Sequence, residues 1–463
     1  THALSEICKE DFVYVSDVGC LPKVCDCPIG LNLLTNPIRQ CTDPELVRTK
    51  FMFYDNETYK EKAYEVNHEF EGIENAPFNN KSLTIFITHG YLGLVPVDMF
   101  FDIIQLYLEK FKNVNVILIN WTEGAVDFYA ASVANVVTVA HQTAQLVKKL
   151  SEKRGMKPDY VRFIGFSLGG QMAGIASRYT FNLTGMKFNE LFGKIKKLKQ
   201  FLVHFIIALD PAGPCYYGMF NNDLGLTKDD GKYVKILHTN EGEYGTTTLS
   251  GRIDICPNGG KEQPDCAMLP VVPCSHLRAL QLSDFDLKKY GDCQPVAYQC
   301  ESYEEFLKGR CASCDNKRCH LMSEDVQLYD SPLAPEFNSK FFGTCFYVKT
   351  SAEKPFCEYH FQIVAKSERT IQSSCSTVNV EVRGRQNFSK TVELEKSGSD
   401  KYLGLVTVAS QEVNYTNPGP INSIIVNGGT VDYLLNILDS SIGLSCDQYI
   451  DEIEVNYMSN IDE

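Results

Sequence analysis

A serine flanked by glycines is the residue of this chain best placed to do chemistry. The motif Gly165-Phe166-Ser167-Leu168-Gly169 follows a short apolar run, Val161 to Ile164, and precedes small residues at helical spacing. A Gly-x-Ser-x-Gly motif between a strand and a helix is typical of a nucleophile elbow, a strained turn that exposes the serine hydroxyl. Side chains at both glycine positions would collide with the neighbouring strand and helix. An ordinary turn is the alternative, and the flanking elements favour a nucleophile.

A nucleophilic serine needs a base to remove its proton and an acid to orient that base. Asp210 is the candidate acid, because it is the first acidic residue after the next predicted buried strand and Pro211 ends that strand. A turn-capping aspartate is the alternative interpretation. If the order along the chain is Ser, Asp, His, the base must follow Asp210.

Four histidines follow Asp210 at suitable positions. His276 is the preferred base, since it opens a predicted helix directly after Cys274, on a loop that a disulfide could hold above the sheet edge. His238 closes a predicted strand, and its alternative role is that of a buried, hydrogen-bonded core histidine. The other two lie in a cysteine-rich segment and in the C-terminal region, His320 and His360.

The negative charge that forms on an attacked carbonyl oxygen needs two N–H donors. We predict that one is the N–H of Leu168, the residue after the serine. The other is predicted at Tyr91, in the loop that ends an earlier strand, because Gly90 before it permits a close approach of the backbone.

These residues must be positioned by a sheet of parallel strands alternating with helices. The apolar segments SLTIFITHGYLG, NVNVILINW, VRFI, FLVHFIIALD and YVKILHTN are predicted strands. Helical spacing covers 97–112, 126–152, the segment after Ser167, and 275–290. Strands that alternate with helices in this way indicate a parallel α/β sheet, and FMFYDNE and YEVNHEF are predicted edge strands.

The pattern changes beyond a Pro- and Ser-bearing stretch at 331–340. The segments EYHFQIVAK, TVNVEVRG, KTVELEK and DEIEVNYM alternate polar and apolar residues and are separated by turn residues, which predicts a β-sandwich. We therefore expect two domains, residues 1–335 with a disulfide-rich N-terminal segment and residues 341–463.

The composition indicates a secreted protein. The 463 residues carry a net charge of −14, which argues against nucleic acid as a partner. No apolar run reaches the roughly 18 residues of a membrane-spanning helix, and the start at Thr1 without a signal-peptide pattern fits a processed chain. The 18 cysteines indicate an oxidising compartment, and Cys311-x-x-Cys314 has no second pair at zinc spacing. Five glycosylation sequons agree with secretion, Asn56, Asn80, Asn182, Asn387 and Asn414. A sixth, at Asn120, ends an apolar strand and is expected to be inaccessible.

Several motifs in order over residues 80 to 320 resemble the pancreatic lipase family. They are THGY, INWTEGA, GFSLGG, ALDPAGP, ILHTN, DICPNGG and CSHLRA. The resemblance implies an α/β-hydrolase catalytic domain followed by a PLAT-like β-sandwich, with Ser167, Asp210 and His276 as the triad. It also implies the disulfides Cys266–Cys274, Cys300–Cys311 and Cys314–Cys319.

Some members of that family bind a structural calcium in the loop after the acid strand. The present chain retains Asp230 there, but Thr227 stands where a carboxylate is expected. A hard cation requires several oxygen ligands, so no cofactor and no metal site are predicted.

The segment between Cys266 and Cys274 corresponds to the lid of the family's triacylglycerol lipases and is only seven residues, AMLPVVP. Its apolar members are Met268, Leu269, Val271 and Val272. Seven residues with two prolines form no helical flap, and the family members with such short lids include phospholipases A₁. The resemblance therefore implies hydrolysis of the sn-1 ester of phospholipids at a membrane, micelle or lipoprotein surface. Triacylglycerol lipase activity and a catalytically silent yolk or storage protein are the alternatives, and a colipase-like partner is left open.

Overall fold

The structure of the protein is a computed structural model, which describes part of the chain. The described residues are 12–15, 19–22, 47–55, 63–93, 97–111, 113–156, 161–184, 205–216, 224–266, 273–283, 293, 295–314, 319–322, 343–366, 377–383, 389–409, 437–438 and 452–458. The predicted lid residues Met268, Leu269, Val271 and Val272 lie outside them, as do the sequons at Asn56, Asn387 and Asn414.

Strands and helices alternate over the first two thirds of the chain, and strands follow. The strands are β1 (Phe12–Val15), β2 (Gly19–Pro22), β3 (Lys50–Tyr54), β4 (Tyr64–Val66), β5 (Leu83–Thr88), β6 (Val114–Asn120), β7 (Val161–Phe166), β8 (Phe205–Leu209), β9 (Tyr233–Leu237), β10 (Ile253–Pro257), β11 (Val296–Gln299), β12 (Cys319–Leu321), β13 (Cys345–Val348), β14 (Glu358–Lys366), β15 (Thr377–Arg383), β16 (Ser389–Lys396), β17 (Lys401–Ala409), β18 (Ile437–Leu438) and β19 (Glu452–Tyr457). The helices are α2 (Val97–Lys110), α3 (Thr122–Ala125), α4 (Tyr129–Arg154), α5 (Leu168–Thr184), α6 (Cys274–Ser283) and α8 (Tyr303–Leu307), with short 3₁₀ turns η1 (Ile73–Asn75) and η2 (Tyr91–Gly93).

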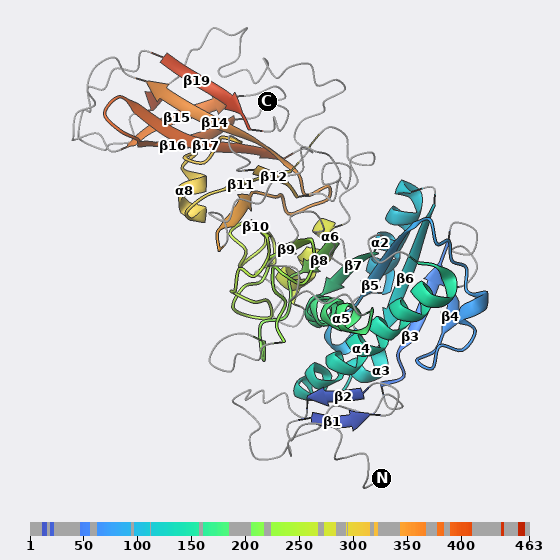
Figure 1. Ribbon diagram of the computed structural model, residues 1–463. Coiled ribbons are helices and arrows are strands. Elements are labelled where there is room, and N and C mark those ends of the chain that lie inside the picture. The colour runs from blue at the N-terminus through green and yellow to red at the C-terminus, as the bar shows by residue number, and fades with distance from the viewer. Residues whose placement is uncertain are drawn as a thin grey trace, which may run out of the picture.

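Eleven strands form one large sheet, in the order β12-β11-β13-β10-β9-β8-β7-β5-β6-β3-β4 (Figure 1). The seven from β13 to β6 run parallel, and antiparallel strands complete both edges. This arrangement confirms the predicted α/β class, with β3 and β4 as edge strands. None of the described helices is long and apolar enough to cross a membrane.

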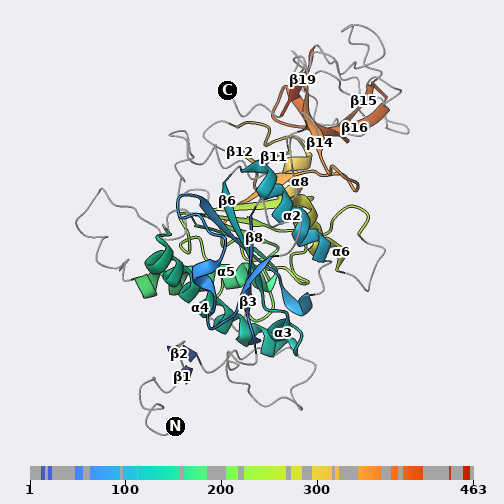
Figure 2. The same cartoon turned by 90° about the vertical axis from the view of Figure 1, so that its right-hand side faces the viewer.

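The parallel strands read as continuous apolar runs because both faces of the sheet are covered. Successive residues of β5 show this: Ile85 and Ile87 belong to a core cluster that includes α2 and α6, whereas Phe86 belongs to a second cluster with α4 and α5. Figure 2 shows the sheet between these two pairs of helices. The helices hold the strands from both sides, so the carboxyl ends of β5, β7, β8 and β9 form a fixed edge.

The helices predicted over 97–112 and after Ser167 agree with α2 and α5, and the one predicted over 275–290 is described only as far as Ser283. One predicted start differs. The helix predicted from residue 126 begins at Tyr129, after a short separate helix, α3. It ends where Gly155 adopts a left-handed φ of 70° and donates its N–H to Ser151 O, a geometry that favours glycine. The three residues 126–128 are thus a connection that carries the exposed side chains of Val126 and Phe128.

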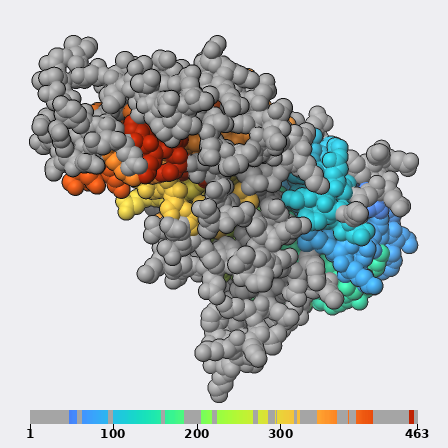
Figure 3. Space-filling view, turned by 90° about the horizontal axis from the view of Figure 1, so that it is seen from above, coloured from blue at the N-terminus to red at the C-terminus, as the bar shows by residue number. Residues whose placement is uncertain are grey.

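The described residues of the C-terminal region form a separate six-stranded antiparallel sheet, β18-β15-β16-β17-β14-β19. All four segments predicted as strands there are strands, and their sheet agrees with the predicted C-terminal β-sandwich. Strand β13 lies inside the range expected for that domain, but it pairs with β10 and β11 of the large sheet and is joined to β10 by the Cys256–Cys345 disulfide. The change of sheet therefore falls between β13 and β14, later than the expected start at residue 341. Figure 3 shows the orange and red tail strands beside yellow α8, away from the blue and cyan N-terminal elements.

Candidate active site

The turn at Ser167 joins β7 to α5 in a strained backbone conformation. Ser167 has a φ of 57°, in the left-handed region that L-residues rarely adopt. A Cβ atom on Gly165 would lie 2.1 Å from the carbonyl oxygen of Gly169, and one on Gly169 would lie 2.7 Å from that of His89. The two glycines are therefore required because the start of α5 and the end of β5 pass directly against this turn.

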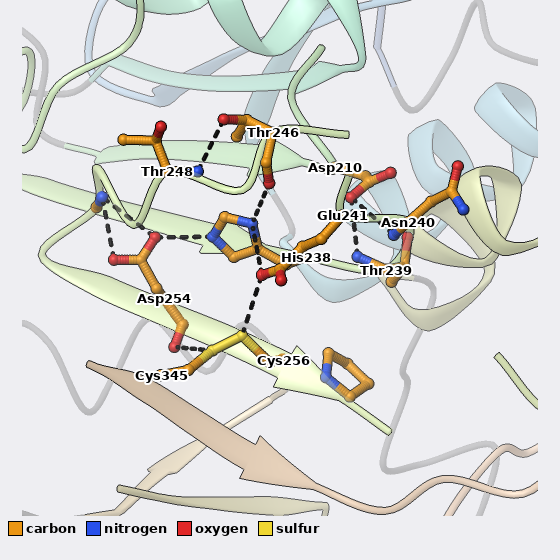
Figure 4. Close-up of polar contacts among 12 residues, drawn as sticks. Asp210, His238, Thr239, Asn240, Glu241, Thr246, Thr248, Asp254, Cys256 and Cys345 are labelled. Carbon is orange, nitrogen blue, oxygen red and sulfur yellow. Dashed lines mark hydrogen bonds and ion pairs between the residues drawn. A yellow bond between two sulfur atoms is a disulfide. The ribbon is translucent and has the colours of Figure 1, made fainter. Parts of the chain in front are cut away.

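Asp210 stands at the end of β8, the strand next to β7, and is completely buried. Its Oδ1 accepts two backbone N–H groups, from Thr239 at 2.8 Å and from Asn240 at 3.1 Å (Figure 4). Its Oδ2 lies 2.5 Å from Nδ1 of His276. Three hydrogen bonds thus fix a buried carboxylate in one orientation.

His276 lies in the first turn of α6, two residues after Cys274. Its ring packs on Phe166, at 4.6 Å between centroids, and on Tyr244 at 5.6 Å. Since Nδ1 faces Asp210, Nε2 is the nitrogen left for Ser167. Phe166 precedes Ser167 in the chain, and the N–H of Ser167 donates to Leu209 O, next to Asp210. The structure therefore brings the three predicted residues together on adjacent elements.

The two predicted oxyanion donors also lie beside the serine. A Cβ on Gly90 would lie 2.6 Å from Ser167 Cβ and 3.1 Å from its Oγ, so the loop that continues into Tyr91 touches the nucleophile. Leu168 is the first residue of α5 and is buried. The N–H groups of the first helical turn have no acceptor within the helix, so that of Leu168 is available to an oxyanion.

His89 is a site residue whose role the sequence did not indicate. Its Nε2 accepts the N–H of Trp121 at 3.1 Å, so Nδ1 carries the hydrogen that is donated to Gly90 O at 3.0 Å. Its ring stacks on Trp121 with 5.3 Å between centroids. Burial lowers the pKa of His89 to about 4, which keeps the ring neutral and fixes the Gly90 loop. The motifs THGY and INW contain both residues, but their contact depends on the pairing of β5 with β6.

His238, the second candidate base, does not contact Asp210 through its side chain. It is completely buried, and its Nε2 lies 2.9 Å from Asp254 Oδ1. Asp254 could not be predicted as its partner, because the two residues meet only through the parallel pairing of β9 with β10. His360 is likewise buried, and its Nε2 accepts the N–H of Lys349. His320 is half-buried and packs edge-on against Phe346.

Disulfides join Cys266 to Cys274, Cys300 to Cys311, and Cys314 to Cys319. Two further pairs, Cys256–Cys345 and Cys293–Cys357, connect segments far apart in the chain. Of the sequons, Asn80 and Asn182 are exposed. Asn120 accepts from both the N–H and the hydroxyl of Thr122, the threonine of its own sequon.

The oxygen atoms around Asp230 do not fit a calcium ion. Both carboxylate oxygens of Asp230 accept from the Arg178 guanidinium, at 2.8 and 2.7 Å, and one also accepts the Thr227 N–H. The guanidinium donates in addition to the carbonyls of Leu224 and Gly225. The oxygens that would ligate a cation are therefore already acceptors for a positive side chain. The described residues contain no group of three or more His, Cys, Asp or Glu placed to hold a metal.

The amino-acid sequence is similar to those of known lipases. A family model described as Lipase matches residues 17–356. Lipase member H of Danio rerio is 31% identical over 65% of this chain and 62% of its own length. Hepatic triacylglycerol lipase of Bos taurus is 27% identical over 79% of this chain and 73% of its own. Pancreatic lipase-related protein 2 of Myocastor coypus is 26% identical, with 78% and 76% covered. The chain spans about two thirds of the length of the curated relatives it matches, for example 65% of one from Crotalus adamanteus.

Proposed function

This chain belongs to the lipase family, and from that premise we propose that it is a secreted carboxylic-ester hydrolase that acts on lipids by Ser-His-Asp catalysis. The observation that carries the proposal is the 2.5 Å contact of His276 Nδ1 with Asp210 Oδ2, beside a serine held in an elbow. The His276 ring also packs on Phe166, the residue before Ser167, which an ordinary turn serine would not require. The five disulfides described between Cys256 and Cys357 support an extracellular location.

In the proposed reaction, Ser167 Oγ attacks the ester carbonyl while His276 Nε2 takes its proton. Asp210 stabilises the imidazolium that forms, and its two backbone N–H bonds keep it from rotating away. The N–H groups of Leu168 and Tyr91 bind the oxyanion of the tetrahedral intermediate. His276 then protonates the leaving alcohol, and a water molecule activated by the same ring hydrolyses the acyl-enzyme.

The short lid supports a proposal for the substrate class. Cys266 and Cys274 are eight positions apart and joined by a disulfide, and a helix of seven residues would span only about 10 Å. Such a segment is too short to seal a wide cleft, so a bulky polar headgroup finds room at its mouth. We therefore propose phospholipid hydrolysis at the sn-1 ester, at a membrane, micelle or lipoprotein surface, with little activation by an interface.

Phosphatidylcholine labelled separately at its two acyl chains tests the proposal. The wild type should release the sn-1 fatty acid from monomeric and aggregated lipid at similar rates. Ser167→Ala should lower the rate by at least about 1,000-fold with an unchanged melting temperature, as the loss of a triad member does. Ser399→Ala, an exposed serine in the turn between β16 and β17, is the matched control and should retain full activity.

Two results would favour other functions. Release of fatty acid only from triacylglycerol would show a triacylglycerol lipase, the activity for which the bovine relative is named. A folded wild type with no hydrolysis of any ester would instead indicate a silent storage or lipid-binding protein.

A further inference from the structure

A buried cluster of charged side chains lies directly behind Asp210. His238 follows the last residue of β9, and Figure 4 shows its ring between Asp254 and Glu241. Nε2 lies 2.9 Å from Asp254 Oδ1, and Nδ1 lies 3.5 Å from Glu241 Oε1 and 3.3 Å from Thr246 O. Both ring nitrogens face acceptors only, which suits the imidazolium because both of its nitrogens donate.

The segment that follows His238 contacts both Asp210 and His276. Residues 239–246, called here the clamp loop, supply the Thr239 and Asn240 N–H groups that hold Asp210 Oδ1. The loop also places Tyr244 against the ring of His276. At its far end, the Thr246 N–H donates to Pro211 O at 2.9 Å.

We propose that His238 is a positioning residue for the reaction, acting through the clamp loop. Its imidazolium, anchored on Asp254, binds Thr246 O at the end of the loop and Glu241 within it. These contacts hold the N–H groups of Thr239 and Asn240 on Asp210 Oδ1. The inference rests on the proposed function. His238 itself touches neither Ser167 nor His276 in the contacts that the described residues make.

The charges that face the cluster come from several elements. Asp254 lies on β10, Asp210 at the end of β8 and Glu241 in the clamp loop. Burial lowers the pKa of His238, but the hydrogen bond and charge of Asp254, together with the charges of Glu241 and Asp210, outweigh it, so the pKa is raised. Burial raises the pKa of Glu241 to about 7, against the opposing charges of His238 and Lys261. The charge of Glu241 also raises the pKa of Tyr347 on β13, although burial is the larger cause.

Asp254→Asn tests the proposal, because it preserves the shape of the anchor but removes the charge that keeps His238 protonated. On p-nitrophenyl butyrate, a soluble ester, we expect kcat at pH 8 to fall by about tenfold or more with KM little changed. The deficit relative to wild type should shrink at pH 6, because solvent protons restore the imidazolium. A purely structural role for Asp254 would give a deficit independent of pH.

Asp230→Asn is the matched control, since Asp230 is also a buried carboxylate paired with a cation. It should lower the melting temperature without a pH-dependent change in kcat. If Asp254→Asn does not fold, Glu241→Gln decides, and it should lower kcat at pH 8 with KM unchanged.

The positioning role is overturned if the folded Asp254→Asn or Glu241→Gln variant has the kcat of the wild type. It is also overturned if the deficit in kcat relative to wild type is equal at pH 6 and pH 8. Those outcomes leave the proposed function intact as long as Ser167→Ala is inactive. A wild type without esterase activity overturns both.

Discussion

At the scale of single residues, three residues in or beside the proposed catalytic machinery have a left-handed backbone. Leu92, Ser167 and Asp210 have φ values of 66°, 57° and 44°, and each follows the carboxyl end of a parallel strand. Such conformations cost about 1–3 kcal/mol each and persist where the surroundings hold them. For Asp210 those surroundings are the clamp loop and His276. Their hydrogen bonds hold the strained residue so that its carboxylate points at the imidazole ring.

Gly245 is predicted to be the most sensitive glycine of the clamp loop. A Cβ there would lie 2.4 Å from Asp210 Oδ1, so Gly245→Ala must displace either the loop or the carboxylate. We expect kcat to fall by about 100-fold, measured on a soluble ester. Gly242→Ala, whose added Cβ would have no neighbour closer than 3.7 Å, should alter stability but leave kcat within a few-fold. Equal losses of kcat in both variants would contradict the steric argument.

His89 makes the fold sensitive to acid. Its pKa is lowered from 6.5 to about 4 in the folded chain, because burial opposes the charged ring. The contribution of the neutral His89 ring to the free energy of unfolding is complete above pH 6.5. It is lost as the pH falls towards 4, since only the unfolded chain binds the proton in that range. The full effect is about 3 kcal/mol.

We therefore expect His89→Gln to lose less unfolding free energy than wild type between pH 7 and pH 4.5, as measured by urea titration. His360→Gln should likewise weaken the dependence of the unfolding free energy on pH, because burial lowers the pKa of His360 to about 3. Only His89→Gln should also lower kcat, since His360 lies in the tail sheet. An unchanged acid dependence in both variants would refute this account.

At the scale of elements, the strands of the large sheet were predictable because both of their faces are buried. Continuous apolar runs such as those of β5, β7 and β8 have no other stable place in a soluble α/β domain. The motifs and their order in the chain also predicted Ser167, Asp210 and His276. The place of β13 was not predictable, because an apolar run does not specify its partner. Parallel pairing with β10 and the Cys256–Cys345 bridge, both distant in sequence, determine it.

The loop 224–230 is predicted to be stable without a metal, because Arg178 of α5 supplies its positive charge. EDTA should change neither melting temperature nor activity. Arg178→Leu should cost about 3 kcal/mol, since it leaves the buried carboxylate of Asp230 unpaired. Lys153→Leu, which breaks the exposed pair with Glu74, should cost under about 1 kcal/mol. A melting temperature that falls with EDTA, or rises with added calcium, would show that a cation holds this loop.

At the scale of the whole molecule, the segment around α8 connects the two sheets. Gln362 of β14 donates to Gly309 O at 2.7 Å, and Glu395 of β16 pairs with Lys308 at 3.0 Å. The core cluster of the large sheet also continues into the tail through Phe361 and Tyr402. A shared apolar core with polar contacts at its edge predicts that the sheets unfold together.

Gly309 offers a direct test of that coupling. It has a φ of +72°, and a Cβ there would lie 2.6 Å from the carbonyl oxygen of Gly404 on β17. Gly343 has a similar φ of +80° but nothing within 4 Å of an added Cβ. Both alanine variants incur the left-handed backbone cost of about 1 kcal/mol, so their difference isolates the contact between the sheets. Calorimetry should show one transition for wild type and Gly343→Ala. Gly309→Ala should give an earlier transition for the tail sheet, whereas matching single transitions in both variants would mean that α8 does not couple the two sheets.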